Sequence, residues 1–531
     1  MSEHVADAVV IGSGPNGLVA TNVLVDAGWD VILLEAADHT GGAVHSAEVT
    51  APGFVSDMFS AFYPLAAASP VIRGLGLEAH GLHWCRSRDV VAHALDDGRA
   101  AVLHADPAAT ATGLDEFAAG DGDAWLRMVA QWDRLRDPLL DALFTPFPPV
   151  IPLTRLLRRT GTAEALDLVR LAVTPVRRLG LERFRGIGGP LLLTGNAMHS
   201  DVPPDAAGSG VFGWLLAMLA QDVGFPVPRQ GAGELAAALE RRAISRGAAV
   251  MTGSRVTRIR VSHGRASGVE LQDGSVVQAR RAVVADVSAP SLYRDLLDAA
   301  HVPGRLRRDL EHFQWDNATI KVNWALSGPV PWTAEGARGA GTVHLGVDLD
   351  GFVDFSADLS VGRTPLRPFI LLGQMTTADV TRSPAGTESA WAYTHVPRGD
   401  WTPEAVDAHV RRVEAAVERV APGFTRLVLA RHVQSPGDLE SDDANLVGGA
   451  INGGTSGLHQ QLFMRPTIGL GRAETPVPGL FLASAAAHPG GGVHGACGWN
   501  AAHAALLDHG PRGTVHRALV RTAWGRLLAG D

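Results

Sequence analysis

Hydrophobic and polar positions near the N-terminus follow one another in blocks that predict a strand, a helix and a second strand. Residues 7–11 form a short apolar run, residues 16–27 carry apolar positions at helical spacing, and residues 31–34 form a second apolar run. A glycine-rich turn separates the first strand from the helix. The pattern therefore predicts a βαβ unit with a tight turn after its first strand.

A second patterned block lies in the middle of the chain. Residues 234–246 predict an amphipathic helix, residues 248–251 predict a strand, and further strands begin at Val256 and end at Asp286. Glycines between these later runs mark hairpin turns. The block therefore reads as a helix followed by several strands.

The stretch "NATIKVNWAL", residues 317–326, alternates with the period of a strand. One face carries Ala318, Ile320, Val322 and Trp324, and the other carries Thr319, Lys321 and Asn323. This predicts a strand with a packed side and a polar side that faces either solvent or a ligand.

Composition makes Lys321 unusual, because it is the single lysine in the chain and the other 45 of the 46 basic residues are arginine. Heavy use of Ala, Arg and Gly indicates a GC-rich coding bias. Under that bias a surviving lysine is either chance or a position where an always-charged, planar guanidinium fails.

Length and charge exclude several classes of protein. The 531 residues, 46% of them hydrophobic, suffice for large cores and suggest two or more domains. A net charge of −9 offers no basic field for nucleic acid. Cys85 and Cys497 lie far apart in the sequence, so we expect no disulfide framework and no metal site, and a reducing cytoplasm. We also expect no signal peptide and no membrane-spanning helix.

The N-terminal glycines have the spacing of a dinucleotide-binding turn. Gly12 permits the turn, Gly14 lets the backbone approach a pyrophosphate, and Gly17 lets the helix pack on the strand. The helix N-terminus faces the phosphate charge. Glu35, at the end of the second strand, can accept hydrogen bonds from a ribose. We therefore predict an adenine dinucleotide site, the alternative being a purely structural glycine turn.

Gly41 and Gly42 follow Glu35, and at this point the chain resembles the FAD-binding superfamily of amine oxidases and phytoene desaturases. Members carry G-x-G-x-x-G, an acid and then a Gly-Gly pair. Ala43 stands where many relatives have Arg, so the resemblance implies no Arg contact to phosphate here.

The C-terminal block extends the resemblance. From Val477 it reads as a strand, a small-residue turn, three glycines and a helix from about Cys497, similar to the flavin motif of phytoene desaturase-related enzymes. A helix entered through glycines presents free N–H groups and a positive dipole end, which suits a reduced flavin; a simple connector is the alternative. Ser484 and Ala486 depart from the motif, where relatives often have glycine.

The resemblance implies FAD, with contacts drawn from separated blocks of the chain. The implied contacts are Gly12, Gly14, Pro15, Asn16, Gly17, Glu35, Gly41, Gly42, Val256, Ser484, Gly491, Gly492 and Val493.

The implied fold class is α/β. A discontinuous, Rossmann-like FAD-binding domain of the glutathione-reductase type takes residues 1–74, 225–295 and 460–531. An α+β substrate domain takes residues 75–224, which carry a helical cap, and residues 296–459.

The candidate catalytic residues are Lys321, His488 and His494. The two histidines flank the C-terminal glycines and suit a base near neutral pH, or instead brace the turn. Lys321 is similar to the lysine that reaches the flavin N5 atom through a water in flavin amine oxidases, although many desaturases lack it. His45 and Tyr63 are weaker candidates.

We expect an FAD-dependent oxidoreductase that converts C–C to C=C in a small apolar substrate of isoprenoid or lipid type, by hydride transfer to N5. The alternatives are an amine oxidase that releases peroxide, a flavin-dependent isomerase and a non-catalytic regulatory flavoprotein. An amine oxidase should carry an aromatic pair that sandwiches the amine.

Residues 151–185 carry eight arginines and three acids among apolar residues. Such a face suits either the surface of an anionic membrane or a solvated cap whose apolar side covers a substrate tunnel. The cap is the favoured interpretation. We therefore expect a cytoplasmic protein, which can also make a peripheral contact with the inner face of the membrane.

Overall fold

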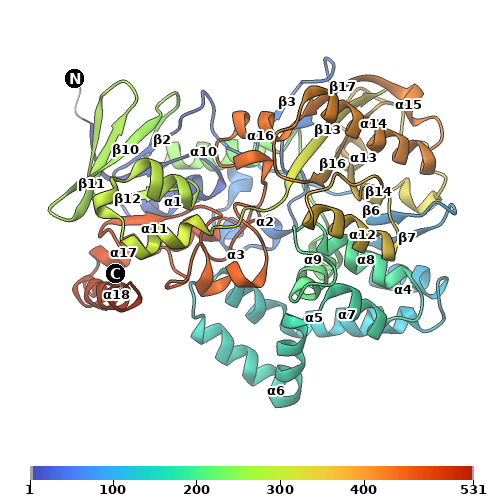
Figure 1. Ribbon diagram of the computed structural model, residues 1–531, viewed down its shortest axis with the longest axis horizontal. Coiled ribbons are helices and arrows are strands. Elements are labelled where there is room, and N and C mark those ends of the chain that lie inside the picture. The colour runs from blue at the N-terminus through green and yellow to red at the C-terminus, as the bar shows by residue number, and fades with distance from the viewer. Residues whose placement is uncertain (1–3, 529–531) are drawn as a thin grey trace.

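The computed structural model describes residues 4–528, and its largest sheets lie toward opposite ends of the molecule (Figure 1). The first sheet consists of β1 (His4–Ile11), β2 (Val31–Leu34), β9 (Ala249–Met251), β10 (Val256–Ser262), β11 (Arg265–Leu271), β12 (Val276–Ala285) and β18 (Leu480–Leu482). Its order is β10-β11-β12-β1-β2-β9, and β18 also pairs with β12. The pairs among β9, β2, β1, β12 and β18 are parallel, whereas β10, β11 and β12 form an antiparallel meander.

Helices cover both faces of the first sheet. One core joins it to helices α1 (Pro15–Asp26), α10 (Gly233–Ser245) and α17 (Ala496–His509). A second core joins the other face to η2 (Ser291–Leu296) and α11 (Gly304–Glu311). The strands are short apolar runs because both faces are buried, as is usual for parallel sheets. Helix α18 (Gly513–Leu527) lies beside α17.

The second sheet consists of β6 (Asp89–Ala94), β7 (Ala100–His104), β13 (Ala318–Leu326), β14 (Ala340–Leu345), β15 (Ile370–Gln374), β16 (Glu388–Val396) and β17 (Val428–Gln434), in the order β17-β13-β16-β15-β14-β6-β7. The predicted apolar face of β13 joins a core with α14 (Pro403–Val420). All nine residues of β13 are buried, so its polar face does not lie in solvent.

A helical region extends from the second sheet. It contains α4 (Pro107–Asp115), α5 (Asp121–Phe144), α6 (Val150–Val173), α7 (Val176–Arg183), α8 (Gly188–Ala197) and α9 (Ser209–Val223). Helix α6 projects from the body of the molecule (Figure 1). The cap interpretation is wrong for α6, because the large apolar side chains of this helix are exposed rather than packed over a tunnel.

Shorter elements connect these parts: β3 (Ser46–Ala47), β4 (Ser56–Asp57), β5 (Trp84–Cys85), β8 (Val227–Pro228), α2 (Pro64–Ala68), α3 (Pro70–Gly74), α12 (Leu349–Ser360), α13 (Met375–Ala378), α15 (Phe424–Leu427) and α16 (Pro436–Asp442). Across residues 4–528, no helix combines the length and apolar character needed to cross a membrane.

Candidate functional site

The glycine turn after β1 is a cradle into which no side chain fits. A Cβ at Gly17 would lie 2.0 Å from the Gly12 carbonyl oxygen, and one at Gly14 would lie 2.8 Å from Asp286 Oδ2. Gly12 itself has φ +87°, which favours glycine. The Gly17 N–H donates to Asp286 Oδ2 at 2.7 Å. These contacts suit a backbone that must approach a pyrophosphate closely.

Glu35 lies directly beside this turn. Its carboxylate accepts hydrogen bonds from the Ser13 N–H at 2.8 Å, the Ser13 hydroxyl at 2.7 Å and the Ala37 N–H at 2.9 Å. The Ser254 N–H donates to the Glu35 carbonyl at 2.7 Å, which brings the start of β10, at Val256, to the same edge. The predicted ribose and adenine contacts therefore lie close together.

The Gly-Gly pair lies against the first glycine turn. The Gly41 N–H donates to the Ser13 carbonyl at 3.0 Å. A Cβ at Gly42 would lie 3.2 Å from the Gly14 Cα and 3.2 Å from Asp443 Oδ2. The second close backbone approach predicted from the sequence is thus next to the first.

Asp286 and Asp443 are acids at this edge that the sequence reasoning missed. Burial raises the pKa of Asp286 to about 8, and it also raises the pKa of Asp443. The charge of Glu35 adds to both shifts. For Asp286, an acid at the carboxyl end of a strand next to the glycine turn was an available signal; for Asp443 we find no such signal in the sequence.

The N-terminal ends of α1 and α17 converge. Pro15 is the first residue of α1, and a Cβ at Gly498 would lie 1.9 Å from the Asn16 carbonyl oxygen. The Gly498 N–H also donates to Asn16 Oδ1 at 3.4 Å. Two positive helix ends therefore lie together, an arrangement that favours an anionic ligand.

The loop before α17 is held by a buried arginine. Arg465 donates to backbone carbonyls of residues 452–455 and 485, at 2.9 to 3.4 Å. A Cβ at Gly491 would lie 2.7 Å from the Asn452 carbonyl oxygen. Nearby, Gly492 has φ +111°, Ser484 is buried and Val493 packs against the core of the first sheet.

His488 and His494 are both buried, and their contacts fit the bracing alternative. His488 Nε2 lies 3.2 Å from the Thr145 carbonyl oxygen. His494 Nδ1 accepts the Ala496 N–H at 3.0 Å, at the first residue of α17. Burial lowers the pKa of each imidazole to about 4, so both are neutral at pH 7. Their catalytic role stays a prediction.

Lys321 is 3% exposed, and coding bias alone does not explain a buried, hydrogen-bonded amine. Its Nζ donates to the backbone carbonyls of Asp57 and, at 3.2 Å, Phe59, and it lies 5.0 Å from the ring centroid of Trp391. Burial lowers the pKa of Lys321 to about 7, although the charge of Asp57 opposes the shift. Lys321 therefore joins the second sheet to the chain that follows the Gly-Gly pair.

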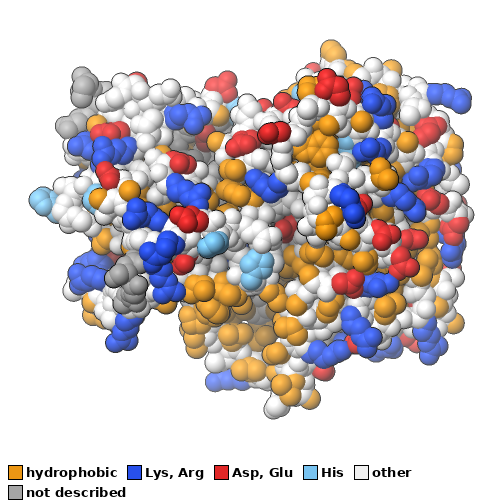
Figure 2. Space-filling model, viewed as in Figure 1, with side chains coloured by type: hydrophobic (Ala, Val, Ile, Leu, Met, Phe, Trp, Pro, Cys, Tyr) orange, Lys and Arg blue, Asp and Glu red, His pale blue; other side chains and the backbone are white. Residues whose placement is uncertain are grey.

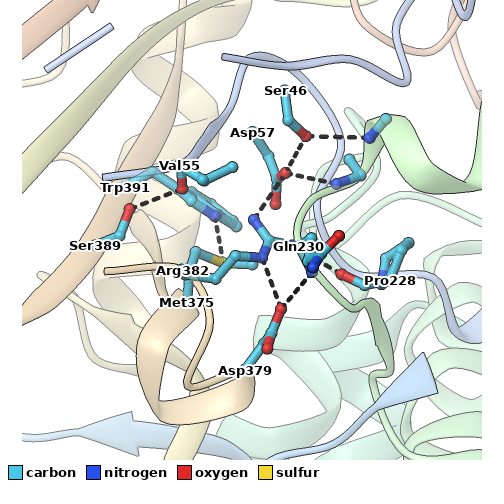
Figure 3. Close-up of polar contacts among 12 residues, drawn as sticks. Ser46, Val55, Asp57, Pro228, Gln230, Met375, Asp379, Arg382, Ser389 and Trp391 are labelled. Atoms are coloured by element: carbon cyan, nitrogen blue, oxygen red, sulfur yellow. Dashed lines mark hydrogen bonds and ion pairs between the residues drawn. The ribbon is translucent and has the colours of Figure 1, made fainter. Parts of the chain in front are cut away.

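A buried ion network beside Lys321 joins the two halves of the molecule (Figure 3). Arg382 donates to Asp57 Oδ1 at 2.9 Å and to Asp379 Oδ2 at 3.1 Å, and the side chains are 0–1% exposed. Asp57 Oδ1 also accepts the Ala232 N–H at 2.8 Å, and Asp379 Oδ2 accepts the Gln230 N–H at 2.8 Å. The network therefore ties the segment just before α10, which packs on the first sheet, to the segment just after α13, beside the second sheet.

The face of the second sheet that carries Lys321 is lined with polar groups. Among the described residues, several of its buried side chains have polar atoms without a hydrogen-bond partner: His93, Asn323, Thr342, His344, His395 and Gln434. His199 Nε2 lies 3.0 Å from His344 Nε2. Buried polar atoms normally find partners, so ordered water or the polar atoms of a bound cofactor would complete the hydrogen bonding of this face.

The weaker candidates lie near the same segment. Tyr63 is buried, and its hydroxyl donates to the Ser60 carbonyl at 2.9 Å. The His45 ring lies against the His39 ring, with centroids 4.2 Å apart and the ring planes tilted by 33°. Neither contact assigns a catalytic role.

The residues present fit a flavin dinucleotide. The glycine cradle and the converging helix ends suit a diphosphate, and Glu35 and the start of β10 suit a ribose and its base. Lys321 donates to the carbonyls of Asp57 and Phe59, in the segment that follows the Gly-Gly pair, and the polar face of the second sheet extends from it.

Comparison with known proteins agrees with this geometry. The family model for flavin containing amine oxidoreductase matches residues 16–506. The chain is 31% identical to mouse pyridine nucleotide-disulfide oxidoreductase domain-containing protein 2, with 94% of this chain and 93% of the relative covered. It is 23% identical to a subunit of limonene dehydrogenase from Castellaniella defragrans, with 95% of each covered.

Solved structures share the fold. Cyclohexylamine oxidase from Brevibacterium oxydans is similar with a TM-score of 0.57 and 16% identity, over 95% of this chain and 99% of that one. The expected mixed α/β fold, with a flavin-binding part and a substrate part, is confirmed at that level. The chain belongs to the family of flavin-containing amine oxidoreductases.

Proposed function

We propose that the protein is an FAD-dependent dehydrogenase that introduces a C=C bond into an apolar substrate of isoprenoid or lipid type. The observation that carries the proposal is the pair Trp391 and Tyr393 beside Lys321, whose rings lie too close together to hold an amine between them. Lys321 itself, an amine buried beside backbone carbonyls, would supply a base in either candidate. Similarity to the limonene dehydrogenase subunit over nearly the whole chain supports this substrate class.

The residues of this chain would divide the reaction between them. Bound FAD supplies the hydride acceptor. Lys321, with a pKa near 7, exists in part as a neutral amine at neutral pH and can take the proton that leaves the neighbouring carbon. The network of Asp57, Arg382 and Asp379 holds this amine at a fixed place relative to the glycine cradle.

An amine oxidase is the second candidate, because Trp391 and Tyr393 form an aromatic pair beside Lys321. Their rings are 13° from parallel, with centroids 5.9 Å apart. A group inserted between two rings needs roughly 7 Å, twice an ordinary contact distance of about 3.5 Å. The rings as placed do not form the sandwich expected of an amine oxidase, which favours the dehydrogenase.

The two candidates differ in an anaerobic reduction experiment. Purified protein carrying FAD would be mixed without oxygen with limonene, with phytoene in detergent and with cyclohexylamine, while the flavin absorbance near 450 nm is followed. We expect bleaching with an isoprenoid and none with the amine. Bleaching by the amine alone, with peroxide formed on adding oxygen, would establish the second candidate. A protein that cannot be loaded with FAD would refute both.

A further inference from the structure

Helix α6 exposes a long apolar stripe. Gly161, with φ +68° and ψ −178°, divides the helix into two helical halves. Each half carries large apolar residues at the same i, i+3, i+7 spacing, which places them on one side of that half. The residues are Val150, Leu153 and Leu157, together with neighbouring Ile151, and then Leu166, Val169 and Val173; they are 41% to 65% exposed.

Such exposure is unusual for a whole helix. A surface helix normally turns its apolar side toward a core, whereas Pro152 is the buried residue of α6, all of which lies in the described range. Figure 2 shows apolar side chains gathered over the part of the surface where α6 projects. Contiguous exposed apolar surface of this kind marks an interaction site.

Positive charge accompanies the stripe. The segment from residue 151 to residue 185 holds eight arginines and three acids, a net charge of +5 in a chain whose total is −9. Arg155 and Arg159 turn away from the stripe and contact α5 through Asp141 and the Arg134 carbonyl. Arg158 and Arg170 are exposed and directly follow Leu157 and Val169, so they border the stripe. An apolar stripe flanked by arginines is complementary to an anionic lipid surface.

The stripe is connected to the candidate site through the loop that precedes α6. The Thr145 carbonyl oxygen lies 3.2 Å from His488 Nε2, and the Phe144 ring centroid lies 5.3 Å from that of His494. The Phe147 ring lies 5.5 Å from that of Phe463, which is 41% exposed. Apolar surface therefore continues from α6 toward the loop that holds the C-terminal glycines.

We propose that α6 docks the protein on an anionic phospholipid bilayer, with its apolar stripe in the interface and the bordering Arg158 and Arg170 at the headgroups. A second copy of the chain is disfavoured as the occupant, because a two-fold dimer would place the same positive segment against itself. Docking would bring the loop of residues 145–149 to the bilayer, next to apolar molecules dissolved there.

Vesicle sedimentation tests the proposal without any enzymatic turnover, so its outcome is independent of the proposed function. The full-length protein would be mixed with sucrose-loaded vesicles of phosphatidylcholine and phosphatidylglycerol in equal parts, or of phosphatidylcholine alone. We expect the protein to bind the mixed vesicles. Binding to phosphatidylcholine alone should be at least about tenfold weaker, because the arginines lose the anionic headgroups. Salt should weaken binding to the mixed vesicles, because it screens the same charges.

The variant Leu157→Ser, Leu166→Ser, Val169→Ser should lose at least about tenfold in vesicle binding. The matched control Leu366→Ser, Val380→Ser, Leu429→Ser changes side chains that are 58% to 81% exposed elsewhere, and it should bind like the wild type. Thermal unfolding would show that both variants are folded.

Three results would overturn the proposal. The wild type could stay in the supernatant with anionic vesicles, or the α6 variant could sediment like the wild type. Alternatively, light scattering could show a wild-type dimer that becomes a monomer in the α6 variant, without vesicle binding; the stripe would then be a contact between copies.

Discussion

The candidate site is formed by the main chain at its nucleotide end and by side chains at its substrate end. At the nucleotide end the backbone forms the site, because Gly12, Gly14 and Gly17 leave no room for a Cβ. At the substrate end side chains form it, and Lys321 and Arg382 are buried beside carbonyls and carboxylates. The nucleotide end should therefore be sensitive to added volume, and the substrate end to the loss of charge.

The largest effect is expected when volume is added at the nucleotide end. In Gly17→Val, the new Cβ would lie 2.0 Å from the Gly12 carbonyl oxygen, so the turn must open. We expect complete loss of bound FAD, measured as flavin absorbance per mole of protein. Gly74→Ala is the matched control, since a Cβ there meets no atom within 4 Å. Normal FAD content in Gly17→Val would show that this turn does not hold the dinucleotide.

The loss of charge at the substrate end should destabilise the protein itself. Arg382→Met leaves Asp57 and Asp379 buried without their cation. Removing one partner of a buried ion pair costs about 3–5 kcal/mol, which would appear as a large fall in the urea midpoint of unfolding. The control is Arg363→Met, which breaks an exposed pair with Asp358 and should cost less than about 1 kcal/mol. Equal effects of the two variants would mean that the network is not needed to hold the halves together.

The same contrast explains what the sequence could predict. The strand over residues 31–34 and the two faces of β13 were predicted correctly, because periodicity is local. The contact of Asp57 with Arg382 joins residues 325 positions apart, and no local pattern encodes it. Helical spacing likewise identified an apolar face around α6, but only the fold shows that this face is uncovered.

The histidines mark a second limit of sequence reasoning. A histidine next to a glycine motif predicts either a base or a brace, and the type of residue does not distinguish them. The contacts of His488 with Thr145 and of His494 with Ala496 appear only when the chain is folded. Asp286 shows the reverse case, where a local signal was present but was not used.

A more specific test of the substrate end uses the titration of Lys321. Its pKa is lowered to about 7 by burial, so the amine is protonated below that pH and cannot accept a proton. We expect the rate of anaerobic flavin reduction to rise as pH increases through about 7. Lys321→Met should lower the rate at pH 8 at least about a hundredfold, abolish this pH dependence and leave FAD bound.

Lys321→Arg serves as the control for charge, because a guanidinium stays protonated throughout this pH range. It should lose the same pH-dependent limb as Lys321→Met. If either variant retained a limb near pH 7, another group would be the base, and Lys321 would only hold the segment of Asp57 and Phe59 in place.

The smallest effect is expected at His494, where a side chain supports the backbone end of the site. His494→Ala removes the acceptor for the Ala496 N–H at the start of α17, and loss of a capping bond of this kind costs about 1 kcal/mol. His494→Asn should restore most of that stability, because its amide oxygen can accept the same bond. Both variants should keep the pH profile of flavin reduction. His494→Asn could instead have the stability of the wild type but reduce its flavin a hundredfold more slowly. In that case His494 would be catalytic, and the nucleotide end would not be formed by the main chain alone.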